Sequence, residues 1–370
     1  MKSRFLLVAG IVGICSTIIF FSCSKSDTGN NGNGGSTDTD STLVKIGNNV
    51  IVPAYQQLNE TVTNLDNAVT TFNTNPTAPN LAALRTNFLA AYNAWETCSE
   101  FQFGPATSQL FVTNTANLFP TNSTLIDNNI NSGSYTIGAI GNLNAEGFPA
   151  IDYLLYNGDD ATVLAKFTTD VHAAAAKQYL AAITNSLQTK ATALYNAWTV
   201  SGGNYIHQFT TATGVNAGSS LSLLANAIVQ EYDVVLKNYK IGIPIGKYGT
   251  STLPIDPTSV EAYYSGQSIP LMITQIQSIQ SLYLAGIDQK VIASGAVKNG
   301  SPLNDVIKDE ITTIITKLQA INGPLSSAIQ NNITPVNDAY TEITKLVVLL
   351  KVDMSSALGV RISFSDDDGD

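Results

Sequence analysis

The sequence predicts an all-α protein built from two packed helical bundles. Apolar residues recur at three- and four-residue intervals through most of the chain after residue 42, which is the pattern of amphipathic helices. Short stretches rich in Gly, Pro and Ser separate these segments. The roughly 330 residues that remain exceed what one hydrophobic core usually holds. We therefore expect one bundle in residues 43–200 and a second in residues 201–370.

The first two expected helices carry the clearest apolar stripes. Residues 50–72 place large side chains on one helix face, namely Val50, Tyr55, Leu58, Val62, Leu65, Val69 and Phe72. Residues 80–101 repeat this spacing, with Asn80 as a suitable N-cap and residues 76–79 as the connection. The pattern predicts two helices joined by a short turn.

Most of the remaining chain also has helical periodicity. Further helices are expected at 160–198, 219–240, 268–292, 302–321 and 324–356.

Three regions depart from this pattern. Residues 103–145 are rich in Asn, Thr, Gly and Ser and predict a long irregular excursion with one short helix near 124–131. Residues 360–366 predict a strand, and the acidic end of the chain predicts a solvated tail.

The N-terminus has the features of a secretion signal. Lys2 and Arg4 precede an uncharged apolar run over residues 5–21. The run ends in FFSC, where a bulky apolar residue and a small residue precede Cys23, as in bacterial lipoproteins. We expect cleavage before Cys23 and acylation of this cysteine. An uncleaved single-span anchor and an ordinary secretory signal are the alternatives.

This interpretation assigns residues 1–22 to a lipoprotein signal peptide and residues 23–42 to an acylated cysteine with a disordered linker. The linker contains no large apolar residue, so burial cannot offset the entropy of ordering it. The protein is therefore expected to be lipid-anchored in the bacterial cell envelope. We place it in the outer membrane, on the periplasmic or the surface face.

The charge balance of the chain narrows the class of partner that it can bind. The formal net charge is −10, and loss of Lys2 and Arg4 with the signal leaves 16 basic against 28 acidic residues, or −12. This balance disfavours nucleic acid as a partner.

The cysteine content predicts no disulfide. After Cys15 is removed and Cys23 is acylated, Cys98 is alone, so no intramolecular disulfide is expected. A buried thiol is the expected role of Cys98.

Four segments together resemble the imelysin family, also called the insulin-cleaving membrane protease or iron-regulated protein A-like family. They are AAYNAWETCSEFQFGP at 90–105, GFPAIDYLLY at 147–156, EAYYSGQSIPLMITQIQSIQSLYLAG at 261–286 and ALGVRISFSDDDGD at 357–370. The last segment is similar to the ends of Bacteroidetes-type lipoproteins of that family. The resemblance implies an all-helical, two-bundle envelope protein associated with iron uptake, in a family that carries a metallopeptidase label.

The family's G-x-H-x-x-E motif is degenerate in this chain. Its histidine position is Pro149, which has no donor atom for a metal, and its glutamate position is Asp152, which is one methylene shorter. Pro149 suits the first turn of a helix, where a missing N–H costs little. A helix start is therefore the structural alternative to a metal site.

The residues that we expect to bind a ligand are Glu100, Glu146, Asp152, Tyr264, Ser265 and Ser268. The resemblance matches Glu100 to the glutamate of the family's T-E-x-F-x-F-G segment. For a metal, we can propose only Asp152 with Glu100 or Glu146. Such oxygen ligands favour iron, calcium or magnesium, and zinc is not expected. His172 and His207 are expected to be ordinary polar residues.

Three functions remain open from the sequence. The first is a non-catalytic binding component linked to iron or haem acquisition, which holds an iron or haem ligand or contacts an outer-membrane receptor. The second is a metal-dependent peptidase, for which no catalytic residue can be named. The third is a structural or adhesive surface lipoprotein. Phosphate-binding and serine-hydrolase motifs are absent from the sequence.

Overall fold

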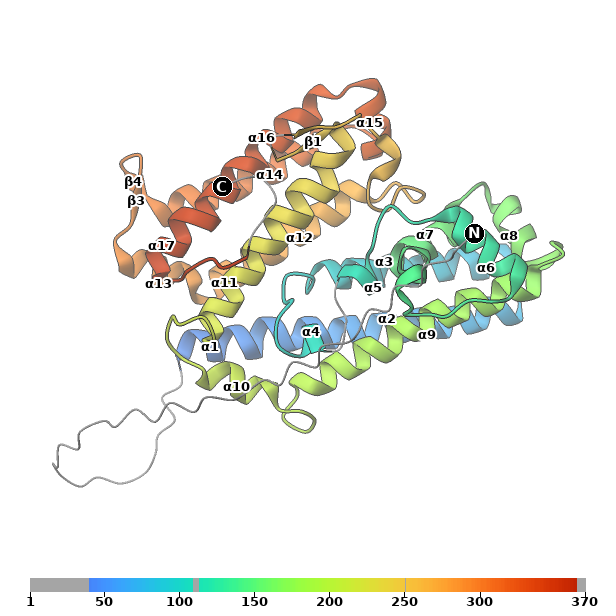
Figure 1. Cartoon of the computed structure of the whole chain (residues 1–370), viewed down its shortest axis with the longest axis horizontal. Coiled ribbons are helices and arrows are strands. Elements are labelled where there is room, and N and C mark those ends of the chain that lie inside the picture. Colours follow the sequence, from blue (N-terminus) through green and yellow to red (C-terminus); the bar gives the residue numbers. More distant parts are fainter. Residues whose placement is uncertain (1–39, 109–112, 250, 365–370) are drawn as a thin grey trace, which may run out of the picture. The chain divides into compact units, whose positions relative to one another are not determined.

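Helices account for most of the structure, a computed structural model that describes residues 40–108, 113–249 and 251–364 (Figure 1). Within these ranges, the strands are two short antiparallel hairpins. They pair β1 (Lys247–Tyr248) with β2 (Ser251–Thr252), and β3 (Val297–Lys298) with β4 (Ser301–Pro302). The prediction of an all-α protein is confirmed. Cys23, with the expected signal peptide, and the end of the acidic tail lie outside the described residues.

The N-terminal helices pack around one long central helix. Helix α2 (Val52–Thr74) contacts α3 (Ala78–Glu96) on one side and α9 (Ala173–Trp198) on another, and α1 (Ser41–Ile46) with η1 (Gly47–Ile51) leads into it. Buried aromatic side chains fill this group, among them Tyr55, Phe72, Phe88, Trp95, Tyr179 and Trp198. The predicted stripe of α2 is thus its packing face. Helix α3 ends earlier than expected, which leaves Glu100 in the turn that follows it.

The segment between α3 and α9 is built from short helices. They are α4 (Pro105–Ser108), α5 (Thr113–Ala116), α6 (Ser123–Ser132), η2 (Ile140–Ala145), α7 (Gly147–Tyr156) and α8 (Asp160–Thr168). Helix α6 is the short helix expected within the irregular excursion. Side-chain caps define its start and that of α8, because Asn122 accepts from the N–H of Leu125 and Asp159 from that of Thr162.

The single helix expected over residues 160–198 is wrong, because the chain breaks between α8 and α9. The carboxylate of Asp170 accepts a hydrogen bond of 2.7 Å from the backbone N–H of His172. A short acidic side chain that binds a nearby backbone N–H competes with the helix. The periodic apolar pattern on both sides concealed this turn.

A second group of helices forms the C-terminal part. It contains α11 (Ser220–Gln230), η3 (Glu231–Gly242), η4 (Ile243–Ile245), η5 (Pro257–Ser259), α12 (Ser268–Leu282), η6 (Tyr283–Ile287), α13 (Asp288–Ser294), α14 (Leu303–Gln319), α15 (Leu325–Asn331), α16 (Thr334–Val348), η7 (Leu349–Met354) and α17 (Ser355–Leu358). Helix α10 (Tyr205–Thr211) precedes this group and packs on α1, η1 and α9 of the N-terminal helices. Helix α14 packs on α16 and α12, and α12 also packs on α3. The described residues together form one compact unit.

Two more expectations in this part are wrong. The helix predicted over 324–356 breaks before α16, because Asn332 leaves the helical conformation at φ −155 and Pro335, in the first turn of α16, favours a new helix start. No strand forms over residues 360–364 of the described chain. Instead, this extended segment pairs with the side chain of Asn226, which donates to the carbonyl of Arg361 at 3.0 Å and accepts from the N–H of Ser363 at 2.7 Å.

The start of α7 requires a glycine. Gly147 has φ +75, and a Cβ there would lie 2.3 Å from the carbonyl oxygen of Ala116. Pro149 follows within the first turn, as its fixed φ and missing N–H favour. The close approach of α5 to this turn therefore sets where α7 begins.

Replacement of Gly147 by Ala should destabilise the protein by at least about 1–3 kcal/mol, because the new Cβ meets backbone and the φ is unfavourable. Urea unfolding measures the change. Gly141→Ala is the matched control, since a Cβ at Gly141 meets nothing within 4 Å. Equal effects of the two substitutions would contradict this role of Gly147.

Candidate ligand-binding site

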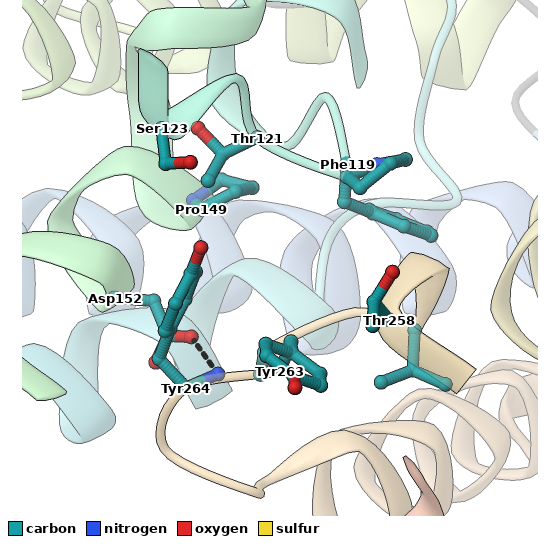
Figure 2. Close-up of a pocket in the computed structure, with 11 residues that line it drawn as sticks. Phe119, Thr121, Ser123, Pro149, Asp152, Thr258, Tyr263 and Tyr264 are labelled. Atoms are coloured by element: carbon teal, nitrogen blue, oxygen red, sulfur yellow. Dashed lines mark hydrogen bonds between the residues drawn. The ribbon is translucent and has the colours of Figure 1, made fainter. Parts of the chain in front are cut away.

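A cavity of about 360 Å³ lies beside the first turns of α7. Three segments line it: residues 119–123, the α7 residues Pro149 and Asp152, and residues 258–264. Figure 2 shows Phe119, Tyr263 and Tyr264 around this space, with Pro149 on its α7 side. The degenerate motif of the sequence therefore faces a cavity. Its volume is within the range of small-molecule sites.

Asp152 connects α7 by hydrogen bonds to the loop that forms the opposite wall of the cavity, near Tyr264. Its Oδ2 accepts a hydrogen bond of 2.9 Å from the backbone N–H of Tyr264, and its Oδ1 accepts one of 3.2 Å from that of Ser265. The same loop holds Ala262 at φ +48, a conformation that costs free energy for a residue with a Cβ. The two hydrogen bonds therefore help to hold a strained turn in place.

Burial governs the protonation of Asp152, which is only 1% exposed. Desolvation raises its pKa to about 6, although the hydrogen bonds from Ser265 and Tyr264 act in the opposite direction. At neutral pH the carboxylate is therefore mostly charged.

The motif positions do not assemble a metal-binding set. Pro149 offers no donor atom, and both oxygens of Asp152 already accept backbone hydrogen bonds. Within the described ranges, no group of three or more His, Cys, Asp or Glu side chains is arranged to hold a metal ion. The arrangement suits contact with a ligand through shape, aromatic faces and charge.

The other expected site residues lie in different places. Ser268 donates to the carbonyl of Glu261 at the start of α12. Both carboxylate oxygens of Glu146 accept from the N–H of Gly138 at 3.0 Å, which closes a loop. Glu100 accepts a hydrogen bond of 2.6 Å from Ser278 of α12. None of these three residues lines the cavity, whereas Tyr264 does.

Glu100 belongs to a buried charged cluster that sequence reasoning did not find. We call Glu96, Glu100, Glu231, Glu261 and Lys240 the interior ionic cluster. All five side chains are at most 4% exposed. Each lies in or next to α3, η3 or α12, so the cluster joins the two groups of helices.

Lys240 is the cation of the interior ionic cluster. Its Nζ lies 2.5 Å from Oε2 of Glu96 and 3.0 Å from Oε2 of Glu261. Although burial lowers its pKa, the charges of Glu261 and Glu96 raise that pKa above the usual value, so Lys240 stays protonated. It thus connects η3 both to α3 and to the residue before the strained Ala262.

Neutral side chains complete the interior ionic cluster. Gln275 donates to Glu231 at 2.8 Å and also to Ser99 at 2.9 Å. Asn117 donates to Glu261 at 2.6 Å and accepts from the hydroxyl of Tyr92 at 2.6 Å. The hydrogen bonds of Asn117 thus link the interior ionic cluster to the segment that lines the cavity, which begins at Phe119.

Four carboxyl groups around one ammonium group cannot all remain charged at low cost. Burial raises the pKa of Glu100 to about 8 and that of Glu231 to about 7. Burial and the nearby charge of Glu261 raise the pKa of Glu96 well above its usual range. The interior ionic cluster therefore binds protons near neutral pH.

The fold and the cavity together define an all-helical protein in which two groups of helices meet at a buried ionic cluster beside a ligand-sized cavity. The family model of imelysin matches residues 51–350, and the chain belongs to the imelysin family. No curated protein matches the chain.

Two solved structures share this fold. One is an imelysin-like protein from Psychrobacter arcticum 273-4, with 18% identity and a TM-score of 0.65, over 88% of this chain and 99% of that chain. The other is named an iron-regulated protein A precursor, from Parabacteroides distasonis ATCC 8503. It has 18% identity and a TM-score of 0.67, over 88% of this chain and 97% of that chain. At this identity the similarity concerns the fold.

Replacement of Lys240 by Met should destabilise the protein by about 3–5 kcal/mol, because Glu96 and Glu261 lose their buried counter-ion. Urea unfolding at pH 7.5 measures the loss. Lys308→Met is the control at an exposed position of α14. A loss below about 1 kcal/mol would show that the ion pairs are dispensable.

The stability of the wild type should fall as pH rises from about 5 to 8. Folded Glu100 and Glu231 hold protons up to about pH 8 and 7, whereas the unfolded groups lose theirs near pH 4.5. Unfolding therefore releases protons in this window, and Glu100→Gln should flatten the pH dependence of the free energy of unfolding. Denaturation at several pH values, with Glu60→Gln as an exposed control, checks this; an unchanged slope in Glu100→Gln would refute it.

Proposed function

We propose that the protein is a non-catalytic binding component of the bacterial cell envelope, anchored by lipid and serving iron acquisition. The observation that carries the proposal is the cavity beside α7, where Pro149 occupies the motif position that would otherwise supply a metal ligand. The cavity keeps the volume and the aromatic walls that binding needs.

Metal-dependent hydrolysis would need more than this cavity provides. A catalytic metal requires about three protein ligands and an open position for water. Among the described lining residues, Asp152 is the one carboxylate, and it is already bound to two backbone N–H groups. Our other candidates for metal ligands, Glu100 and Glu146, accept hydrogen bonds from Ser278 and from the N–H of Gly138. This supports binding over cleavage.

The link to iron rests on similarity. The Parabacteroides distasonis protein that shares this fold is named an iron-regulated protein A precursor. We propose the same process for this chain, with an iron or haem ligand or an outer-membrane receptor as its partner. The family model's name also includes a peptidase label, which keeps a metal-dependent peptidase as the second candidate.

The proposal of a lipid anchor rests on the sequence around Cys23. Asp40, near the start of the described chain, forms an ion pair of 2.8 Å with Lys290 on α13. The described helices include none with the length and apolar character needed to cross a bilayer. A lipid at Cys23 would hold the folded part through the chain that leads into α1 (Ser41–Ile46).

A strain that lacks the protein should grow more slowly on limiting iron and normally on ample iron, because the deletion removes a component of iron acquisition. The wild-type gene should restore growth, whereas Cys23→Ser should restore it poorly because the anchor is lost. Growth curves with matched protein levels measure this. Equal growth of the deletion and the parent on limiting iron would overturn the link to iron.

Purified mature protein tests the peptidase alternative directly. Hydrolysis of peptides by wild type that holds zinc or iron in stoichiometric amount would favour the second candidate. The double variant Pro149→His, Asp152→Glu is the reference, because it restores the histidine and glutamate of the family motif.

A further inference from the structure

We propose that the cavity beside α7 binds the trimethylammonium group of a choline-type ligand. This inference rests on the proposed function in one respect: the cavity is taken as the binding site of the protein. It adds the chemical class of the ligand, which neither the family nor the similar structures supply.

The charge of the cavity favours a cation. Asp152 is the one lining residue that carries charge at neutral pH, and the described lining contains no Lys, Arg or His. An anionic ligand would therefore meet a negative potential without a basic partner.

The walls suit a cation that carries methyl groups. Phe119, Tyr263 and Tyr264 surround the space, as Figure 2 shows. The rings of Tyr263 and Tyr264 stand nearly perpendicular, at 82° with centroids 5.1 Å apart. Rings set at an angle form the corner of an aromatic cage, and their faces attract a quaternary ammonium ion. Pro149 and Val260 add apolar contact for the methyl groups.

The composition of the lining favours a quaternary over a metal cation. Asp152 is the one carboxylate among the described lining residues, so a metal ion that needs several oxygen ligands would be poorly served. A trimethylammonium group donates no strong hydrogen bond and needs only nearby negative charge and aromatic faces. Asp152 can supply that charge without releasing Tyr264 or Ser265.

Two hydroxyl groups in the cavity can receive the rest of the ligand. Thr121 donates its hydroxyl proton to the carbonyl of Asn144 at 2.9 Å, and Thr258 donates its own to Asp256 at 2.6 Å. Because both protons are engaged, the oxygen atoms remain as acceptors in the cavity lining. The hydroxyl group of choline is a suitable donor to either of them.

Titration of the full mature protein with choline and with 3,3-dimethylbutan-1-ol tests the inference. The second compound has the same shape but replaces the charged nitrogen by carbon. We expect choline to bind at least about 10-fold more tightly, by calorimetry or ligand-detected NMR. Phosphocholine forms a further arm: binding equal to that of choline indicates a lipid headgroup as the source, and weaker binding indicates a free small molecule.

Variants assign the effect to the cavity. Tyr263→Leu should weaken choline binding by about 10-fold, and Tyr239→Leu is the control at another partly exposed tyrosine. Asp152→Asn should reduce the preference for choline over its neutral isostere. Thermal melts establish that each variant is folded.

Two results would overturn the inference: no binding of choline up to about 10 mM, or equal binding of the neutral isostere. The growth test on limiting iron is independent of both. If the deletion strain grows slowly on limiting iron but the protein does not bind choline, this inference fails and the proposed function stands. If the protein binds choline but the deletion strain grows normally on limiting iron, the link to iron fails and the choline site stands.

Discussion

The buried contact of Lys240 with Glu96 and Glu261 is the constraint on which much of the structure depends. It brings one cation from η3 against a carboxylate at the end of α3 and another just before α12. Removing charges from water is costly, so such a cluster persists only where the surrounding helices hold every partner in place. The two groups of helices therefore share an ionic interior in addition to their apolar contacts. Their relative position is set by directional interactions as well as by apolar packing.

The ion pair of Lys240 with Glu261 helps to position the cavity wall formed by residues 258–264. Glu261 is followed directly by Ala262, whose positive φ turns the chain toward Tyr263 and Tyr264. Asp152 then binds the backbone N–H groups of Tyr264 and Ser265 from the other side. The loop is thus held at one end by an ion pair and at the other by a carboxylate. These two contacts position the aromatic rings that face the cavity, because the edge-to-face contact between Tyr263 and Tyr264 is weaker than either of them.

The substitutions in the family motif are coherent in physical terms. Proline at position 149 gives up a possible ligand but provides a favourable helix start after Gly147. Aspartate at position 152 keeps the charge on a shorter side chain, and its carboxylate is used to bind the facing loop. With these two residues, a motif that could hold an ion instead connects helix α7 to a wall of the cavity.

The sequence by itself determined the helical class, the helix start near Pro149, and the stripes of α2 and α3. These features follow from local spacing and backbone preference, which a linear pattern records. It missed the break at Asp170 because a single side-chain hydrogen bond outweighed the periodicity there. The residues that line the cavity were predicted only in part, through Asp152 and Tyr264. Only the tertiary structure decided that Glu100 faces Ser278 and that Lys240 meets Glu96, more than a hundred residues away. No periodicity encodes such pairs, because burial of charge is settled by how distant helices pack.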